Sequence, residues 1–206
     1  LRDIGKAVGF EVYWDSENGC VQVESGKPYT GEEPAKDEVI KPTPQPEPTV
    51  PANDADVDAM KQDIVDRTNA LRKESGIAAL TTNDKLMQAA QVRADEMGAN
   101  TVYSHTRPDG RNFNTVTDCP YMAENIHRIA TRYLSQHDVS LVEAAVDGWA
   151  NSETHLRNIR NERLNAIGVG IAKGVNAAGE ESWYCVQLFL YDCCVISQVD
   201  TPITPK

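Results

Sequence analysis

The chain has 206 residues, a net charge of −11 and a hydrophobic content of 40%, enough for one domain of ordinary size and an additional segment. The acidic balance excludes nucleic acid and anionic lipid as general partners, because their phosphate groups would be repelled. No run of about 18 apolar residues occurs, so we expect no transmembrane segment.

Residues 1–26 predict a short helix followed by a β-hairpin. Two short strands at residues 11–15 and 20–23 flank an Asn-Gly turn. The pattern resembles the closing half of the copper amine oxidase N-terminal-like module, which implies a stalk or wall-proximal spacer. No histidine cluster accompanies it, so we expect no copper. Because Leu1 falls inside this unit, we also expect that an upstream segment has been removed.

Residues 27–56 are predicted to form an acidic, Pro-rich linker. Seven of the eleven prolines lie between Pro28 and Pro51, with hardly any large apolar side chain among them. Such a segment cannot bury enough apolar surface to offset the entropy lost on ordering it. We therefore expect an extended, semi-rigid connection.

The rest of the chain is predicted to contain helices first and strands last. The spacing of apolar residues predicts helices over residues 57–75, 83–97 and 140–149. Asn83 is a good N-cap for the second helix, and Gly76 and Gly98 end the first two. Alternating segments at residues 166–172 and 182–191 predict an antiparallel hairpin. This order indicates an α+β domain over residues 57–195, followed by a tail over residues 196–206.

Five cysteines leave the redox state open. They are Cys20, Cys119, Cys185, Cys193 and Cys194. The odd count leaves at least one of them unpaired within the chain. If Cys193 and Cys194 lie on a strand, they point in opposite directions, so at most one of them faces Cys119 or Cys185. One structural disulfide and a fully reduced chain are both compatible with the sequence.

Three short runs carry the most informative residues of the chain. They are Ser-His-Thr-Arg-Pro-Asp-Gly-Arg at 104–111, Ala-Glu-Asn-Ile at 123–126 and Trp-Ala-Asn-Ser-Glu-Thr-His-Leu-Arg-Asn-Ile at 149–159. Each is predicted to be a turn or a helix start rather than core. Together with Ile-Gly-Val-Gly at 167–170 and Val-Gln-Leu-Phe at 186–189, they resemble the bacterial form of the CAP superfamily signature (cysteine-rich secretory, antigen 5 and pathogenesis-related proteins). The resemblance implies a three-layer α-β-α sandwich with an antiparallel central sheet.

The resemblance also implies a groove. His105, Glu124 and His155 match three of the four groove positions of the family, and Ser152 stands where the fourth has glutamate. Imidazoles bind divalent transition metals, and a carboxylate beside them supplies a third ligand or a proton acceptor. We therefore expect zinc or another divalent metal at His105, His155 and Glu124, with water completing the site. The alternative is that the same residues only hold the loops together through hydrogen bonds.

Other polar residues in these runs are predicted to have structural roles. Arg107 and Arg111 should pin their loop, Asn125 and Asn158 should satisfy buried backbone groups, and Ser152 should cap a short helix. Trp149 is predicted to lie in the core. His127 and His137 are predicted to be surface or loop residues, because nothing in the sequence pairs with them.

These expectations combine into one leading hypothesis and two alternatives. The leading hypothesis is an exported protein, extracellular or associated with the cell wall, whose groove binds a small-molecule, lipid or cell-surface ligand. The first alternative is a metal-assisted hydrolase that uses Glu124 as the base. The second is an interaction module without chemistry.

Overall fold

The computed structural model describes residues 11–15, 20–24 and 54–203, with side chains from residue 56 onward. The chain separates into two units, residues 1–45 and 46–206. In the first unit, strands β1 (Glu11–Asp15) and β2 (Cys20–Glu24) pair antiparallel, which confirms the predicted hairpin. The predicted helix over residues 1–10, the Asn-Gly turn and the linker up to residue 53 lie outside the described residues.

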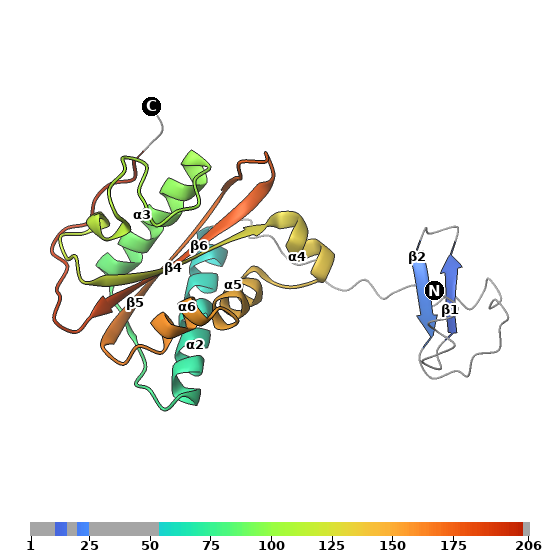
Figure 1. The fold of residues 1–206 in the computed structure, drawn as a ribbon, viewed down its shortest axis with the longest axis horizontal. Coiled ribbons are helices and arrows are strands. Elements are labelled where there is room, and N and C mark those ends of the chain that lie inside the picture. The colour runs from blue at the N-terminus through green and yellow to red at the C-terminus, as the bar shows by residue number, and fades with distance from the viewer. Residues whose placement is uncertain (1–10, 16–19, 25–53, 204–206) are drawn as a thin grey trace. The chain divides into compact units, whose positions relative to one another are not determined.

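The second unit is built around a four-stranded sheet (Figure 1). The strand order is β3 (Thr81–Thr82), β5 (Leu164–Val175), β6 (Glu181–Tyr191) and β4 (Met122–Ala130). Strand β6 pairs antiparallel with both β5 and β4, and the two-residue strand β3 runs parallel to β5. The three long strands are thus antiparallel, as predicted, and the sheet gains one short parallel strand at its edge.

Helices cover both faces of this sheet (Figure 1). Helix α3 (Asp84–Asn100) lies on one face, and α2 (Asp54–Glu74), α5 (Leu141–Ala150) and α6 (Glu153–Ile159) lie on the other. Helix α4 (Thr131–His137) follows β4, and a short 3₁₀ helix spans Phe113–Val116. The α+β three-layer sandwich is therefore confirmed. None of the helices among the described residues has both the length and the apolar character needed to cross a bilayer.

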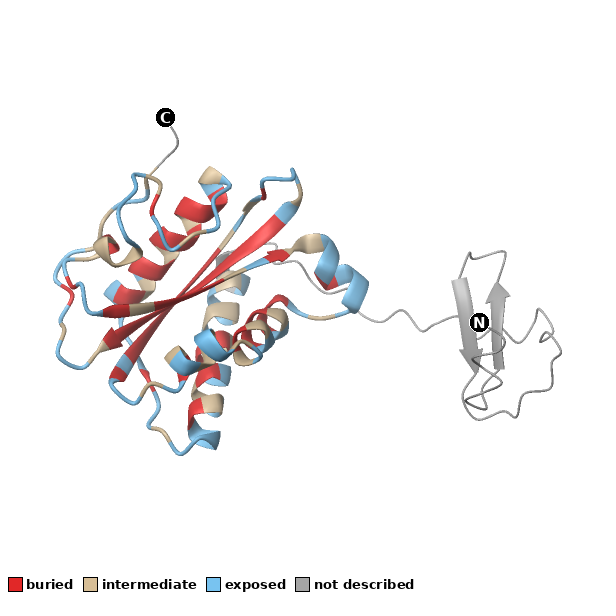
Figure 2. Ribbon diagram, viewed as in Figure 1, coloured by how far each residue is buried: buried red, intermediate tan, exposed pale blue. Residues whose placement is uncertain are grey.

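Strand β6 shows why the domain has two cores. Trp183, Cys185 and Phe189 pack in the cluster with α2 and α5, whereas the intervening residues, such as Tyr184 and Val186, pack in the cluster with α3. Successive side chains of a strand point to opposite faces. Because both faces are covered, nearly the whole of β6 is buried (Figure 2).

The glycines of β5 set the distance between the sheet and α3. A Cβ atom at Gly168 would overlap the backbone carbonyl of Leu86, and one at Gly170 would overlap that of Ala90. Only glycine lets two backbones approach this closely. The Ile-Gly-Val-Gly run therefore has a packing role, because it seats α3 on the sheet.

Strand β4 is the main departure from the sequence-based expectation. The run at residues 123–126 was predicted to be a turn or a helix start, but it forms a buried strand. Met122 and Ile126 face the α3 layer, and Ile129 faces the opposite layer. The strand pattern is hidden in the sequence because the residues between them, Glu124 and Asn125, are polar yet buried. Helix α2 also begins at Asp54, before the predicted start at Val57.

The C-terminal segment and one disulfide close the α3 side of the domain. Cys119 and Cys194 form a disulfide, with their Cα atoms 6.2 Å apart and 75 residues apart in sequence. Cys193 and Cys194 lie in the turn after β6 rather than on a strand. Beyond them, the backbone amide of Asp200 donates to the Val116 carbonyl, so this segment packs on the domain.

Candidate functional site

The site begins with a histidine held by a carboxylate. His105 lies in the loop after α3, and its Nδ1 atom is 2.6 Å from Oε2 of Glu124 on β4. The imidazole side chain is 54% exposed, whereas the Glu124 carboxylate is fully buried. An ionised carboxylate accepts the Nδ1 proton, which leaves Nε2 as a hydrogen-bond acceptor on a half-exposed ring.

The second oxygen of Glu124 is also occupied. Arg93 Nε donates to Glu124 Oε1 at 2.9 Å, and the same guanidinium contacts Glu96 Oε2 at 2.9 Å and the Ser104 carbonyl at 2.8 Å. Buried charges require paired partners, and here positive and negative groups alternate. Because both of its oxygens are engaged, Glu124 serves mainly to orient the His105 ring.

The chain of charged residues extends from the interior to Asp200, a partly exposed residue of the C-terminal segment. Arg107 donates to Glu96 at 2.6 Å and to Asp200 at 2.6 Å. Burial tends to lower the pKa of the Arg107 guanidinium, but its hydrogen bonds to Glu96 and Asp200 outweigh that effect and raise the pKa. Arg111 bonds to Asp109 in its own loop and to Asp200 in the C-terminal segment. The predicted loop-pinning role of Arg107 and Arg111 is confirmed.

Sequence reasoning missed Arg93 and Glu96. Both are fully buried on α3 and lie on the stripe that otherwise carries buried apolar residues such as Leu86 and Met97. The sequence did contain a signal: an arginine and a glutamate lie three residues apart on the otherwise apolar face of the helix. Such residues are rarely buried unless they are paired, so their position indicates a buried ion pair.

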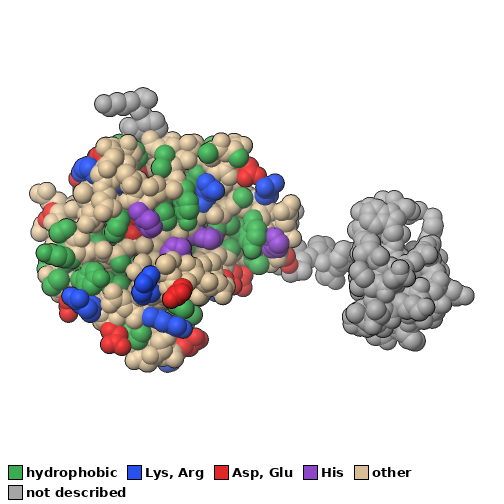
Figure 3. All heavy atoms as spheres, in the orientation of Figure 1, with side chains coloured by type: hydrophobic (Ala, Val, Ile, Leu, Met, Phe, Trp, Pro, Cys, Tyr) green, Lys and Arg blue, Asp and Glu red, His purple; other side chains and the backbone are tan. Residues whose placement is uncertain are grey.

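His155 reaches the site from the other layer. It lies on α6, and its carbonyl accepts a hydrogen bond of 3.2 Å from Asn125 Nδ2. Its Nδ1 atom is buried and has no hydrogen-bond partner among the described residues. Burial lowers the pKa of His155, and the nearby charge of His105 lowers it further. Histidine side chains gather near the middle of the face shown in Figure 3.

A buried amide network fixes the position of α6. Asn158 Nδ2 donates to the Glu124 carbonyl at 3.3 Å and to Asn125 Oδ1 at 2.9 Å. Asn125 in turn donates to Gln187 Oε1 at 3.0 Å, and Gln187 donates to Thr68 on α2. The predicted role of Asn125 and Asn158, bonding to buried backbone groups, is confirmed.

The remaining predicted residues have mixed outcomes. Ser152 occupies the N-cap position of α6, but its hydroxyl contacts Thr154 Oγ1 at 3.1 Å and caps no backbone amide. Trp149 is fully buried, as predicted. His137 is exposed at the end of α4, as predicted. The surface-or-loop prediction was wrong for His127, which lies half-buried on β4 against Trp149, with 6.4 Å between ring centroids.

The side chains around His105 and His155 offer fewer free ligands than the expected metal needs. Both Glu124 oxygens are already hydrogen-bonded. The atoms of this group that are left to bind a metal are Nε2 of His105 and Nδ1 of His155. Across residues 56–203, no three His, Cys, Asp or Glu side chains gather in an arrangement that could hold a metal ion. Zinc sites take three or four ligands from the protein. The residues therefore do not fit the predicted three-ligand site, and a metal here would rest on two imidazoles and on ligands from outside these residues.

Comparison with known proteins gives consistent matches. The family model described as CAP, cysteine-rich secretory protein family, matches residues 65–189. The uncharacterized protein YkwD of Bacillus subtilis is 26% identical over 114 residues, which cover 55% of this chain and 43% of YkwD. The uncharacterized membrane protein YlbC of the same organism is 26% identical over 111 residues, covering 54% of this chain and 31% of YlbC. The chain thus spans less than half the length of these curated relatives.

A solved structure supports the fold. The crystal structure of an extracellular protein containing a SCP domain from Bacillus anthracis matches with a TM-score of 0.53 at 24% identity. The match covers 70% of this chain and 45% of that chain. A likeness at this identity concerns the arrangement of the helices and the sheet.

Proposed function

Because this chain belongs to the CAP family, we propose that it is an exported protein that binds a ligand in a groove around His105, Glu124 and His155. The Pro-rich stretch over residues 27–53, which ends where α2 begins, would act as its stalk, outside the cell or at the cell wall. The extracellular SCP-domain protein from Bacillus anthracis supports this location. The acidic charge of the chain supports a neutral or cationic ligand.

The observation that carries the proposal is the unpaired Nδ1 atom of His155. A buried polar atom without a partner costs about 1–3 kcal/mol, so such atoms are few and call for an explanation. His105, whose charge lowers the pKa of His155, is held by Glu124 with Nε2 as an acceptor. The acceptor Nε2 of His105 and the unpartnered Nδ1 of His155 would suit hydroxyl or amide groups of a small molecule, a lipid headgroup or a cell-surface sugar.

Ligand binding is tested with N-acetylglucosamine, a probe that carries both hydroxyl and amide donors. We expect saturable shifts of the His105 and His155 ring signals in nuclear magnetic resonance spectra, and loss of binding in His155→Ala. His137→Ala is the matched control, because His137 is an exposed histidine on α4. Ring signals that do not move with this probe would count against a sugar-like ligand.

Binding of zinc or another divalent metal remains a prediction of the same groove. The donors would be His105 and His155, and Glu124 would orient the His105 ring, as carboxylates commonly do for metal-bound histidines. Equilibrium dialysis with zinc should show uptake by the wild type and by His137→Ala, and none by the His105→Ala/His155→Ala double variant. Equal uptake by all three proteins would rule out this metal site.

A metal-assisted hydrolase is the second candidate, favoured by the Glu124–His105 pair. Because Glu124 is bonded to both Arg93 and His105, it has no free oxygen to act as the predicted base. Nε2 of His105 would act as the base only in a reaction in which it does not also hold the metal. A protein that binds neither zinc nor the sugar probe would leave the interaction module as the remaining hypothesis.

The stalk is tested by limited proteolysis. We expect cleavage between Tyr29 and Asp54 and a resistant fragment that begins near the start of α2. Full resistance across this stretch would mean that it packs on a folded unit.

A further inference from the structure

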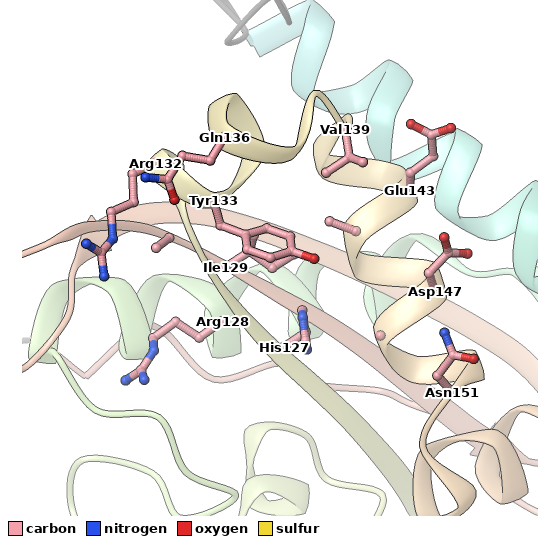
Figure 4. Close-up of a pocket in the computed structure, with 13 residues that line it drawn as sticks. His127, Arg128, Ile129, Arg132, Tyr133, Gln136, Val139, Glu143, Asp147 and Asn151 are labelled. Atoms are coloured by element: carbon pink, nitrogen blue, oxygen red, sulfur yellow. The ribbon is translucent and has the colours of Figure 1, made fainter. Parts of the chain in front are cut away.

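A pocket of about 590 Å³ lies between the end of β4, helix α4 and helix α5 (Figure 4). Its volume is in the range of small-molecule sites. Residues 127–130, the last four of β4, line it, whereas His105, Glu124 and His155 do not. It is therefore separate from the groove to which the preceding function is assigned.

One side of β4 has no strand partner among the strands that the structure describes. Because β4 stands at the end of the strand order, half of its backbone N–H and C=O groups face away from β6. The Tyr121 carbonyl, just before β4, accepts from an amide at the end of β6, whereas the carbonyls of Glu124 and Ile126 accept from side chains outside the sheet. Alternate residues face the same way, so the backbone groups of Arg128 also face away from β6.

This edge is covered at Ile126 and open at Arg128. Tyr103 Oη donates to the Ile126 carbonyl at 3.0 Å, and Ile126 is only 3% exposed. Arg128 is exposed, and no group among residues 56–203 bonds to its backbone N–H or C=O from this side. An exposed strand edge is a template for pairing with another chain. The N–H and C=O of Arg128 match those of one residue of an extended peptide.

The side chains of β4 divide between two faces at this point (Figure 4). His127 lies between β4 and α5, where a Cβ atom at Gly148 would be 2.8 Å from Cε1 of its ring. Arg128 lies on the opposite face, with its guanidinium over the Tyr103 ring and 5.4 Å from the ring centroid. A guanidinium stacked in this way keeps its in-plane N–H donors for an anion.

The other charged side chains that line the pocket are engaged elsewhere. Arg132 forms a salt bridge of 2.8 Å with Glu180, and Glu143 forms the capping box at the start of α5. The charge of Asp147 acts on an arginine of α2. Among the residues that line the pocket, Arg128 is therefore the cation without a salt bridge to any residue of 56–203.

We propose that the edge of β4 at Arg128 is a second binding site, for an extended peptide that adds a short strand to the sheet. One peptide residue would pair with Arg128 through two backbone hydrogen bonds, and directly opposite residues share a face. An acidic side chain there would meet the Arg128 guanidinium. Its two neighbours would point to the other face, into the pocket lined by Tyr133, Val139 and Ala144.

The site therefore fits one acidic residue between two apolar ones. The chain has a net charge of −11, which disfavours a peptide with several acidic residues. Opposite charges on directly opposed strand residues stabilise the pairing modestly, so the backbone bonds and the apolar contacts would supply most of the affinity.

The blocked tripeptide acetyl-Val-Glu-Val-amide tests this site. Titration into the whole chain should shift the Arg128 backbone amide and the Tyr133 ring signals saturably in nuclear magnetic resonance spectra. The same peptide methylated on the nitrogen of its glutamate lacks the N–H that would donate to the Arg128 carbonyl, so we expect about tenfold weaker binding. The His105→Ala/His155→Ala double variant should bind the peptide like the wild type, which separates this test from that of the groove.

Side-chain variants test the two faces of the peptide. Acetyl-Val-Gln-Val-amide should bind the wild type about threefold more weakly than the glutamate peptide, and this difference should vanish in Arg128→Gln. Arg163→Gln is the control, because Arg163 is also an exposed arginine over a tyrosine ring, outside the pocket. Tyr133→Ala should weaken binding about threefold, whereas Tyr121→Ala, which replaces an exposed tyrosine outside the pocket, should not.

Equal affinity for the methylated and unmethylated peptides, or the absence of saturable shifts at Arg128, would overturn the proposal. So would shifts of these signals with protein concentration alone, because a second copy of the chain would then occupy the edge. A difference between the glutamate and glutamine peptides that persists in Arg128→Gln would overturn the role of this arginine. Thermal unfolding checks that each variant folds, and if one does not, the methylated peptide on the wild type still decides.

Discussion

The Nδ1 atom of His105 and the Oε2 atom of Glu124 lie 2.6 Å apart, and the bond joins a half-exposed ring to a fully buried carboxylate. Glu124 is itself fixed by Arg93, and Arg93 by Glu96. The exposed imidazole therefore takes its orientation from charges in the interior of the α3 layer. His155 comes from α6 in the opposite layer, near enough for the charge of His105 to lower its pKa.

Replacing Glu124 by glutamine should destabilise the domain and loosen His105. Arg93 would lose a buried negative partner, and we expect a loss of about 1–3 kcal/mol in the free energy of unfolding. Urea denaturation measures this. Glu153→Gln is the control, because Glu153 is exposed at the start of α6 and its loss should stay within about 0.5 kcal/mol. Equal losses in the two variants would contradict the orienting role of Glu124.

Stability should fall as the pH is lowered through the histidine range. Burial lowers the pKa of both His127 and His155, and a neighbouring histidine lowers each further. Between these lowered values and the unfolded value near 6.5, the unfolded chain binds more protons than the native state. The free energy of unfolding is then constant above about pH 7 and decreases below it.

Urea denaturation between about pH 8 and pH 5 checks this slope. The His127→Gln/His155→Gln double variant should flatten it, and His137→Gln should leave it unchanged because His137 is exposed. A wild-type stability that stays level or increases on acidification would show that burial of these two rings does not govern the response.

Adding one methyl group to Gly168 should be far more costly than adding one to Gly148. At Gly168 the new Cβ meets the backbone carbonyl of Leu86, which cannot move without shifting α3 from the sheet. We expect Gly168→Ala to cost about 1–3 kcal/mol or more. At Gly148 the neighbour is the His127 ring, a side chain that can rotate away. Thermal unfolding of the two variants measures the difference. Similar midpoints for both would contradict this prediction.

The cysteines should react in a fixed order. Cys193 is exposed and should be alkylated in the native protein. Cys185 is fully buried, and burial raises the pKa of its thiol to about 12, so it should react only after unfolding. Cys119 and Cys194 should need a reductant first. Peptide mapping by mass spectrometry after iodoacetamide treatment checks this order, and native labelling of Cys185 would contradict it.

Signals from neighbouring residues were sufficient to predict most helices and the long hairpin of β5 and β6. Asn83 caps α3 with its side chain, and Ser140 and Glu143 form a reciprocal capping box at the start of α5. Residues near these ends satisfy backbone groups a few positions away, so their effect can be read from neighbouring residues. The alternating residues of β5 and β6 predicted their pairing for the same reason.

Strand β4 and the alternating charges that run from Glu124 through Arg93 to Glu96 could not be predicted in this way, because their stability comes from residues far away in sequence. Glu124 and Asn125 are buried in a strand only because Arg93, Asn158 and Gln187 satisfy their polar groups. The family resemblance brought His105, Glu124 and His155 together, but it did not reveal that the carboxylate is shared with Arg93. A buried charge is tolerated only where its partner is also present, and that condition is met by tertiary packing alone.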